Sequence, residues 1–214
     1  MKSVLIVFSM MFAVNPNSGF GVWSATSTSE LTHVHSYTKS YHEAGVSEKA
    51  FNLAIDKLKE VAKNEQYSAL LTIIDFNLPS TAKRFWVLDL DSKEVLFNTY
   101  VSHGRNSGEN NAIKFSNKPE SHMSSLGLYL TGDVYYGKHG LSLYLDGLEP
   151  GVNDNARKRS IVIHGADYVS HDFIKKHGRL GRSYGCPALP LEHYKEIIGL
   201  IANGSFIYIN KQTI

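Results

Sequence analysis

Residues 161–165 (Ile-Val-Ile-His-Gly) and 181–187 (Gly-Arg-Ser-Tyr-Gly-Cys-Pro) are the most informative stretches of this sequence. The first is a β-branched apolar run that ends in histidine and glycine, a pattern typical of a strand end. The second places glycine before and proline after the single cysteine of the 214-residue chain. This order predicts a tight turn that presents the thiol at a surface.

Cys186 and His164 have the chemistry of a nucleophile and its base. A thiolate is the attacking species, and a neighbouring imidazole lowers the pKa of a thiol or removes its proton. We expect the backbone N–H groups of Gly185 and Cys186 to hold an oxyanion. The alternatives are a small buried cysteine and a histidine satisfied in the core. A metal site is less favoured, because His171 and His177 have no ligand spacing with His164. We expect no cofactor.

The N-terminus has the pattern of a secretory signal peptide. Lys2 precedes an apolar run over residues 3–14, which is shorter than the roughly 20 residues of a membrane span. Small residues follow at Ser24 and Ala25, so we expect cleavage there and export of the protein to the periplasm or cell envelope. The alternatives are a short core segment or an uncleaved anchor. After cleavage of residues 1–25 we expect no stable membrane span.

Export changes the meaning of the lone cysteine. Exported proteins that use cysteine structurally need pairs, and Cys186 has no partner in the chain. The formal net charge is +2, and no basic stripe interleaved with aromatics is present, so nucleic acid is not an expected partner. The short basic cluster at residues 156–159 is interpreted as a solvated loop.

The N-terminal part of the mature chain is expected to carry no chemistry. Residues 26–42 are rich in serine and threonine and predict a loosely ordered leader. Ser47 then caps an amphipathic helix that runs to about Asn64, with Val46 and Phe51 as a hydrophobic staple. Residues 26–66 are therefore assigned to leader and helix, and residues 67–214 to the catalytic domain.

The rest of the chain has the short apolar runs and turn signals of a mainly β domain with flanking helices. A polar stretch over residues 102–125 predicts a long loop, and residues 191–202 have helical period ended by Asn203-Gly204. Predicted strands cover Ala69–Phe76, Arg84–Leu90, Val95–Val101, Leu126–Leu130, Leu141–Leu145, Ser160–His164 and Ser205–Asn210, the second and third forming a hairpin.

His164-Gly165 followed by Ser183-Tyr184-Gly185-Cys186 resembles the His-Gly … Ser-x-Gly-Cys signature of the L,D-transpeptidases, the YkuD-like enzymes of peptidoglycan. The match is closest to the murein L,D-transpeptidase catalytic domain family, which residues 102–108, 124–127 and 136–140 also resemble. The resemblance spans roughly residues 70–210. Papain-like and cell-wall amidase families place cysteine before histidine, which argues against them.

The resemblance implies an L,D-transpeptidase-like β-sandwich catalytic domain that acts on peptidoglycan stem peptides. Cys186 would attack the carbonyl preceding the terminal D-alanine of a tetrapeptide stem, and His164 would serve as base and then as acid. The acyl group would pass to an amine of a second stem in a transpeptidase of cell-wall biogenesis, or to water in an L,D-carboxypeptidase. Two other classes stay open: a non-catalytic exported peptidoglycan-binding protein, and an envelope structural protein whose cysteine forms an intermolecular disulfide.

Two positions depart from the family pattern. Many members have a second histidine where this chain has Tyr184, and an arginine where it has Ala188. Arg182 is therefore the candidate for binding the substrate carboxylate, with a simple surface arginine as the alternative. Tyr184 and Tyr168 would line the acyl pocket or simply pack. The full set of expected substrate-binding residues is Arg182, Ser183, Tyr184, Gly165, Tyr168 and His139.

Overall fold

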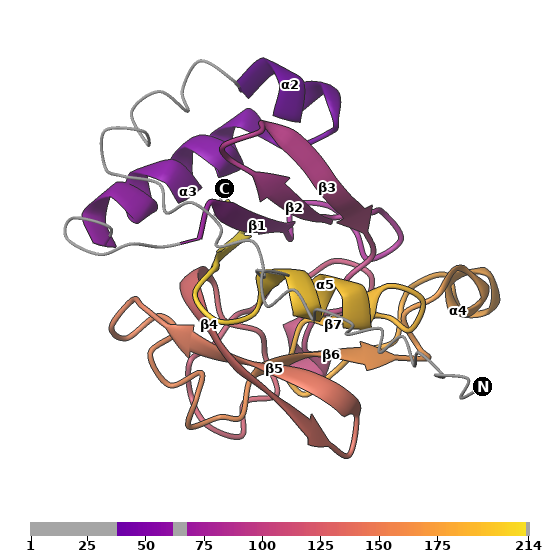
Figure 1. The fold of residues 1–214 in the computed structure, drawn as a ribbon. Helices are drawn as coiled ribbons and strands as arrows, with labels where there is room; N and C mark the ends of the chain where they lie inside the picture. Colours follow the sequence, from indigo (N-terminus) through magenta and orange to yellow (C-terminus); the bar gives the residue numbers. More distant parts are fainter. Residues whose placement is uncertain (1–37, 62–67, 213–214) are drawn as a thin grey trace, which may run out of the picture.

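The computed structural model describes residues 38–61 and 68–212 (Figure 1). The predicted signal peptide and the leader up to residue 37 lie outside these ranges, so both stay predictions. No helix among the described residues is long and apolar enough to span a membrane.

Eight strands form one sheet in the order β3-β2-β1-β8-β4-β5-β6-β7. Most neighbours are antiparallel, but β1 runs parallel to β8 and β6 runs parallel to β7. The fold class is therefore mainly β with flanking helices, as predicted. The strands are β1 (Leu70–Asp75), β2 (Phe85–Asp89), β3 (Glu94–Thr99), β4 (Gly127–Gly137), β5 (Gly140–Gly147), β6 (Val162–Ala166), β7 (Ala188–Pro190) and β8 (Phe206–Asn210).

The two ends of the sheet approach each other, which makes it nearly a barrel. The segment after β3 reaches the outer edge of β7, where the Ser102 N–H donates to the Ala188 carbonyl at 2.9 Å. The contact continues as an isolated bridge between Gly104 and Ser183. The long polar loop over residues 102–125 is thereby tied to the cysteine turn.

The curled sheet encloses the main core. Its inward side chains come from both halves of the sheet, including Ile74, Val87, Tyr129 and Ile163. Helix α5 (Tyr194–Ile201) packs its isoleucines into the same core. In Figure 1 this helix lies between the β1–β3 and β4–β6 halves.

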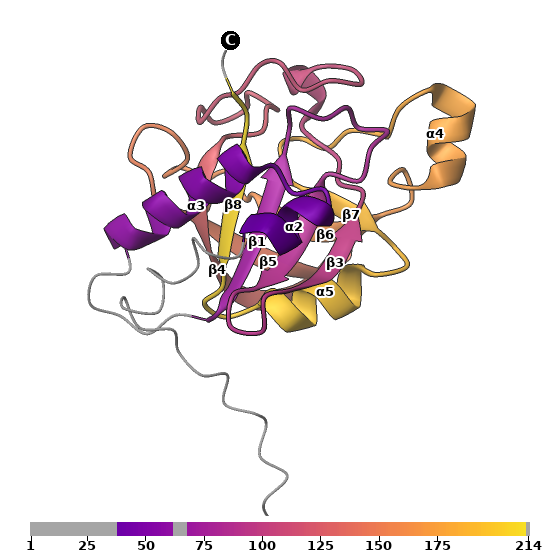
Figure 2. The ribbon, with the colours of Figure 1, turned by 90° about the horizontal axis from the view of Figure 1, so that it is seen from above.

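Two N-terminal helices cover the outer face of the sheet, α2 (Thr38–Glu43) and α3 (Glu48–Val61) (Figure 2). The cap at Ser47 is confirmed, because its Oγ accepts from the Ala50 N–H. The staple residues Val46 and Phe51 are both buried in the core beneath the helices, which also holds Leu71 and Trp86.

The prediction of a loosely ordered leader up to residue 42 is wrong for its last part, which forms α2. Tyr41 explains the difference: it is buried, its ring lies 5.1 Å from that of Phe51, and its hydroxyl donates to the Asp89 carbonyl at 2.7 Å. A single aromatic anchor thus orders a segment whose composition is otherwise polar.

Three further elements differ from the predicted pattern. The strand predicted to end at Leu130 continues as β4 to Gly137 and forms a long hairpin with β5. The polar stretch before the cysteine contains the short helix α4 (His171–His177), which Ser170 caps through the Phe173 N–H. Strand β7 was not predicted, because three residues are too few for a periodic signal.

A buried arginine orders the start of the 102–125 loop. Arg84 is fully buried, and its guanidinium donates to the carbonyl of Val101 and to Nδ1 of His103 at 2.7 Å. The opposite ring nitrogen of His103 donates to the Gly108 carbonyl at 3.3 Å. Both ring nitrogens are therefore used by a neutral imidazole, and burial beside Arg84 lowers the pKa of His103 to about 4.

This histidine makes stability fall in acid. In the unfolded chain His103 takes up a proton near its ordinary pKa of 6.5. In the folded chain it stays neutral until the pH falls to about 4. The free energy of unfolding should therefore drop by up to about 3 kcal/mol as the pH falls through that window. Urea unfolding at pH 7 and pH 4 should show a smaller drop for His103→Gln, and equal drops in both proteins would contradict this assignment.

Candidate active site around Cys186

A serine holds the turn that carries the cysteine. The Ser183 Oγ donates to the Cys186 carbonyl at 2.6 Å and accepts from the Gly185 N–H at 3.0 Å. Gly185 itself has φ +125, and a Cβ at this position would lie 2.8 Å from the Met123 carbonyl oxygen. Only glycine fits there, so the turn before the thiol is fixed by sterics as well as by hydrogen bonds.

The Cys186 thiol lies in a mixed environment at the start of β6. The residue is half-buried, and its sulfur lies 3.6 Å from the Ser160 carbonyl. Burial raises the pKa of the thiol, and the N–H groups of Val162 and Cys186 together with the cations of Arg159 and Lys138 oppose that shift. The thiol is therefore protonated at rest, but its thiolate has donors and cations beside it.

The His164 imidazole is buried on β6 with a defined hydrogen bond. Its Nδ1 donates to the Gly165 carbonyl at 3.0 Å, which leaves Nε2 as the nitrogen that can accept a proton. The ring of His139 stacks on it with 4.4 Å between centroids. Burial lowers the pKa of His164, and His139 and Lys138 lower it further. The imidazole is therefore neutral at neutral pH.

The sheet places the turn that carries Cys186 beside the strand that carries His164. Strand β7 pairs with β6 so that His164 faces Ala188, two residues beyond Cys186. The sulfur lies beside the Val162 N–H, two residues before His164, which is about 7 Å along a strand. Lys138, at the β4–β5 turn, acts on the pKa of both groups.

Three of the expected substrate-binding residues line one open groove of about 350 Å³. Arg182 and Tyr184 enter it from the cysteine loop, and Tyr168 forms another wall. The pKa of Tyr168 is raised to about 12 by burial and by the charge of Cys186, which places this ring near the thiol. The remaining lining residues are Arg105, Phe173, Arg179 and Gly181.

The other expected residues have different surroundings. His139 lies over His164, at the end of the long hairpin. Gly165 was expected to let substrate approach, but a Cβ there would lie 2.6 Å from the ring of Tyr194, so its small size serves the packing of α5. The Ser183 hydroxyl forms its hydrogen bonds within the turn. Because it accepts from the Gly185 N–H, this N–H is not free to donate to an oxyanion.

Arg159 is the main residue that the sequence analysis missed. It belongs to the basic cluster that was interpreted as a solvated loop, which is wrong for this side chain. Its guanidinium donates to the carbonyls of Ser116 and Met123 and to the hydroxyls of Ser121 and Ser125. Arg159 therefore ties the 116–125 loop to the cysteine turn and places a positive charge near the thiol.

Ser124 is a second missed residue. Its Oγ accepts from the Gly104 N–H at 3.0 Å and donates to the Gly185 carbonyl at 3.2 Å. A single hydroxyl thus joins the two loops that border the thiol. Ser124 lies in a polar stretch without hydrophobic periodicity, so the sequence did not indicate this role.

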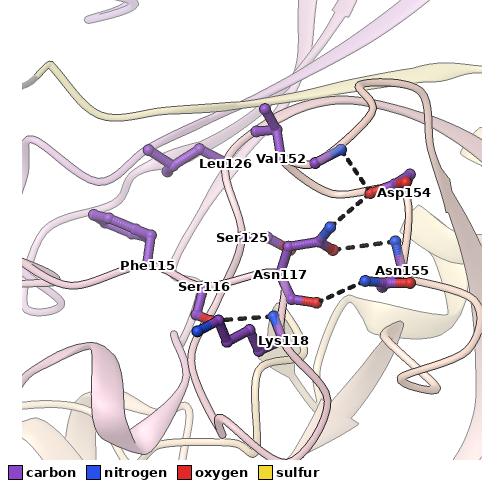
Figure 3. A pocket seen from close by; sticks show the side chains of 10 residues that line it. Phe115, Ser116, Asn117, Lys118, Ser125, Leu126, Val152, Asp154 and Asn155 are labelled. Carbon is purple, nitrogen blue, oxygen red and sulfur yellow. Dashed lines mark hydrogen bonds between the residues drawn. The ribbon is translucent and has the colours of Figure 1, made fainter.

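A larger open pocket of about 510 Å³ shares Ser116 and Ser125 with the Arg159 contacts, and Cys186 is not among its lining residues. Figure 3 shows that its polar side chains bond to one another: Asn117 donates to Asp154 at 2.6 Å, and Asn155 donates to the Asn117 carbonyl. These groups are already satisfied, so the pocket offers few free partners for a polar ligand.

Within the described ranges, no three His, Cys, Asp or Glu side chains converge where they could hold a metal ion.

Residues 42–210 match the family model described as the L,D-transpeptidase catalytic domain. The chain belongs to this family. The match covers the Cys186 turn, His164 and the whole sheet. At its N-terminal side it extends beyond the range suggested by the sequence motifs, through α3 to the last residues of α2. No curated protein matches the L,D-transpeptidase domain described here.

Distant similarity to solved structures accompanies the family match. An L,D-transpeptidase from Mycobacterium smegmatis is 14% identical, with 67% of this chain and 59% of that chain covered and a TM-score of 0.41. The C442S mutant of the Enterococcus faecium L,D-transpeptidase is 12% identical, with 74% and 64% covered and a TM-score of 0.43. The cell shape determining protein Pgp2 of Campylobacter jejuni (K307A mutant) is 16% identical, with 68% and 48% covered and a TM-score of 0.43. This chain thus spans less than two thirds of the length of each of these structures.

Gly185→Ala should disrupt the turn. The backbone strain at φ +125 and the contact with Met123 should cost on the order of 1–3 kcal/mol, which lowers Tm by about 3–10 °C. Gly199→Ala, in open space on α5, is the matched control and should leave Tm unchanged or slightly higher. Equal melting temperatures for the two variants would rule out a steric role for Gly185.

The raised pKa of Cys186 predicts slow alkylation at neutral pH. Because the chain has one cysteine, iodoacetamide incorporation followed by mass spectrometry reports on this thiol alone. The pH midpoint of labelling in the folded protein should lie above that of the same protein in urea. A folded midpoint below the unfolded one would show a resting thiolate and contradict the assignment.

Proposed function

We propose that this chain is an exported cysteine L,D-transpeptidase that transfers an acyl group from a tetrapeptide stem of peptidoglycan with release of the terminal D-alanine. The observation that carries the proposal is the β6–β7 pairing, which brings the Cys186 turn beside the strand of His164 within a domain of this family. The apolar run and small residues of positions 1–25 support export.

The first step starts from two neutral groups. Burial disfavours both the thiolate and the imidazolium, so His164 Nε2 accepts the thiol proton as the sulfur attacks the carbonyl preceding D-alanine. A carbon–sulfur bond forms and the carbonyl oxygen becomes an oxyanion. The hydrogen bond from Nδ1 to the Gly165 carbonyl fixes the ring orientation and favours the imidazolium that forms.

Backbone N–H groups stabilise the charge that develops in this step. The N–H groups of Cys186 and Val162 face the sulfur and are the candidate donors to the oxyanion, in place of the Gly185 N–H. An oxyanion donor contributes about 3 kcal/mol. The guanidinium of Arg159 adds a positive charge on the same side.

Collapse of the tetrahedral intermediate completes the acyl transfer to the enzyme. The carbon–nitrogen bond to D-alanine breaks, and the imidazolium of His164 returns its proton to the departing amine. A thioester on Cys186 remains. An amine of a second stem then attacks the thioester, or water does so in the carboxypeptidase alternative, and His164 removes the proton of the attacking group.

Cys186→Ala should abolish the release of D-alanine from a tetrapeptide stem, because no thioester can form. His164→Gln should lower kcat/KM by about 10²- to 10⁴-fold, as expected for loss of a general base. Mass spectrometry of the products also separates cross-linked dimers from free tripeptides, and hence the transpeptidase from the carboxypeptidase. Undiminished release by Cys186→Ala would refute the proposal, and stem binding without any turnover would favour a binding protein.

A further inference from the structure

The open groove beside the cysteine loop is rich in arginine. Arg105, Arg179 and Arg182 all line it, together with the aromatic rings of Tyr168 and Tyr184. The guanidinium of Arg105 lies 5.7 Å from the Tyr184 ring centroid. Such a surface suits a ligand that is anionic and extended.

The carboxylate of Glu109 forms ion pairs with two of these arginines. One oxygen of Glu109 lies 3.0 Å from Nε of Arg179, and the other lies 2.6 Å from Nη1 of Arg182. The Glu109 side chain is 71% exposed. The hydrogen bond from Arg182 and the two positive charges hold the pKa of Glu109 below its ordinary value, so it is charged at neutral pH.

The two arginines are anchored independently of Glu109. Arg182 Nη1 donates to the Gly108 carbonyl at 3.1 Å, and Arg179 Nη1 donates to the Leu180 carbonyl at 2.8 Å. Their side chains are only 22% and 26% exposed. A fixed pair of guanidiniums and an exposed carboxylate make an ion pair that contributes little to stability and can exchange partners.

We propose that Arg179 and Arg182 form a carboxylate-binding subsite for the donor peptide, and that Glu109 occupies this subsite until a substrate carboxylate displaces it. The inference rests on the proposed function, since it assigns the substrate class of the same groove. Each substrate oxygen takes the place of one Glu109 oxygen, so the number of charge-assisted hydrogen bonds is conserved in the exchange.

Two aromatic residues that line the groove lie near the reacting sulfur. Tyr168 lines the groove, and the charge of Cys186 contributes to the raised pKa of its hydroxyl. Tyr184 lines it two residues before Cys186 in the same turn. A peptide anchored by a carboxylate at the arginines therefore extends past these rings toward the thiol.

Steady-state kinetics of D-alanine release test the exchange directly. Glu109→Gln removes the competing charge, so KM for a tetrapeptide stem with free carboxylates should fall about two- to fivefold with kcat unchanged. Arg179→Met should raise KM about three- to tenfold. Glu60→Gln on α3, equally exposed at 70%, is the matched control and should change neither constant.

Peptide analogues show whether a carboxylate is what the subsite binds. One analogue carries an amide at its C-terminus, and another carries amides at its remaining carboxyls. The proposal requires that, for one of these two analogues, neither Glu109→Gln nor Arg179→Met changes KM. If both analogues and the free peptide respond equally, or if none responds, the subsite does not exist.

Calorimetric binding of the same peptides to Cys186→Ala separates this inference from the proposed function. Tighter binding of the free peptide after Glu109→Gln in that background supports the subsite even when no peptide is turned over. Turnover that depends on Cys186 while Glu109→Gln changes neither KM nor binding overturns the subsite and leaves the enzyme assignment intact.

Discussion

The parallel pairing of β6 with β7 is the constraint on which the site depends. Strand β7 has three residues, and its register with β6 decides which part of the chain lies beside the thiol. The pairing sets Cys186 next to Val162, so that His164 follows on the same strand. The isolated bridge between Gly104 and Ser183 holds the opposite edge of the same segment. A shift of this register by one residue would move the thiol relative to the imidazole.

The electrostatics of the site follow from its burial. Removal from water favours the neutral forms of both Cys186 and His164, whereas the N–H groups and cations around the sulfur favour the thiolate. In the proposed mechanism, this balance means that the proton moves from the thiol to the imidazole during attack instead of beforehand. Arg159, which is half-buried, joins the 116–125 loop to the cysteine turn, and in the proposed mechanism it supplies a positive charge where negative charge develops.

The sequence allowed the fold class and most strands to be predicted, because these depend on local patterns. Alternation and turn residues indicate strands, and a glycine before the cysteine indicates a turn. Helix α2, strand β7 and the role of Arg159 could not be predicted in this way. Each depends on hydrogen bonds between residues that are far apart in the sequence. These bonds join Tyr41 to Asp89, Ala188 to Ser102, and Arg159 to Ser116. The local sequence around a charged residue in a polar stretch is the same whether or not loops cover its side chain.

Nitrogen NMR of the His164 side chain tests the central claim most directly, with the resonance assigned by comparison with His164→Gln. At pH 7 the account predicts a neutral ring that carries its proton on Nδ1 and has a free Nε2. The Nε2 resonance should shift when Cys186 is replaced by alanine, because the sulfur is then absent. An imidazolium at pH 7, or a spectrum that does not respond to loss of the thiol, would contradict the pairing of these two residues.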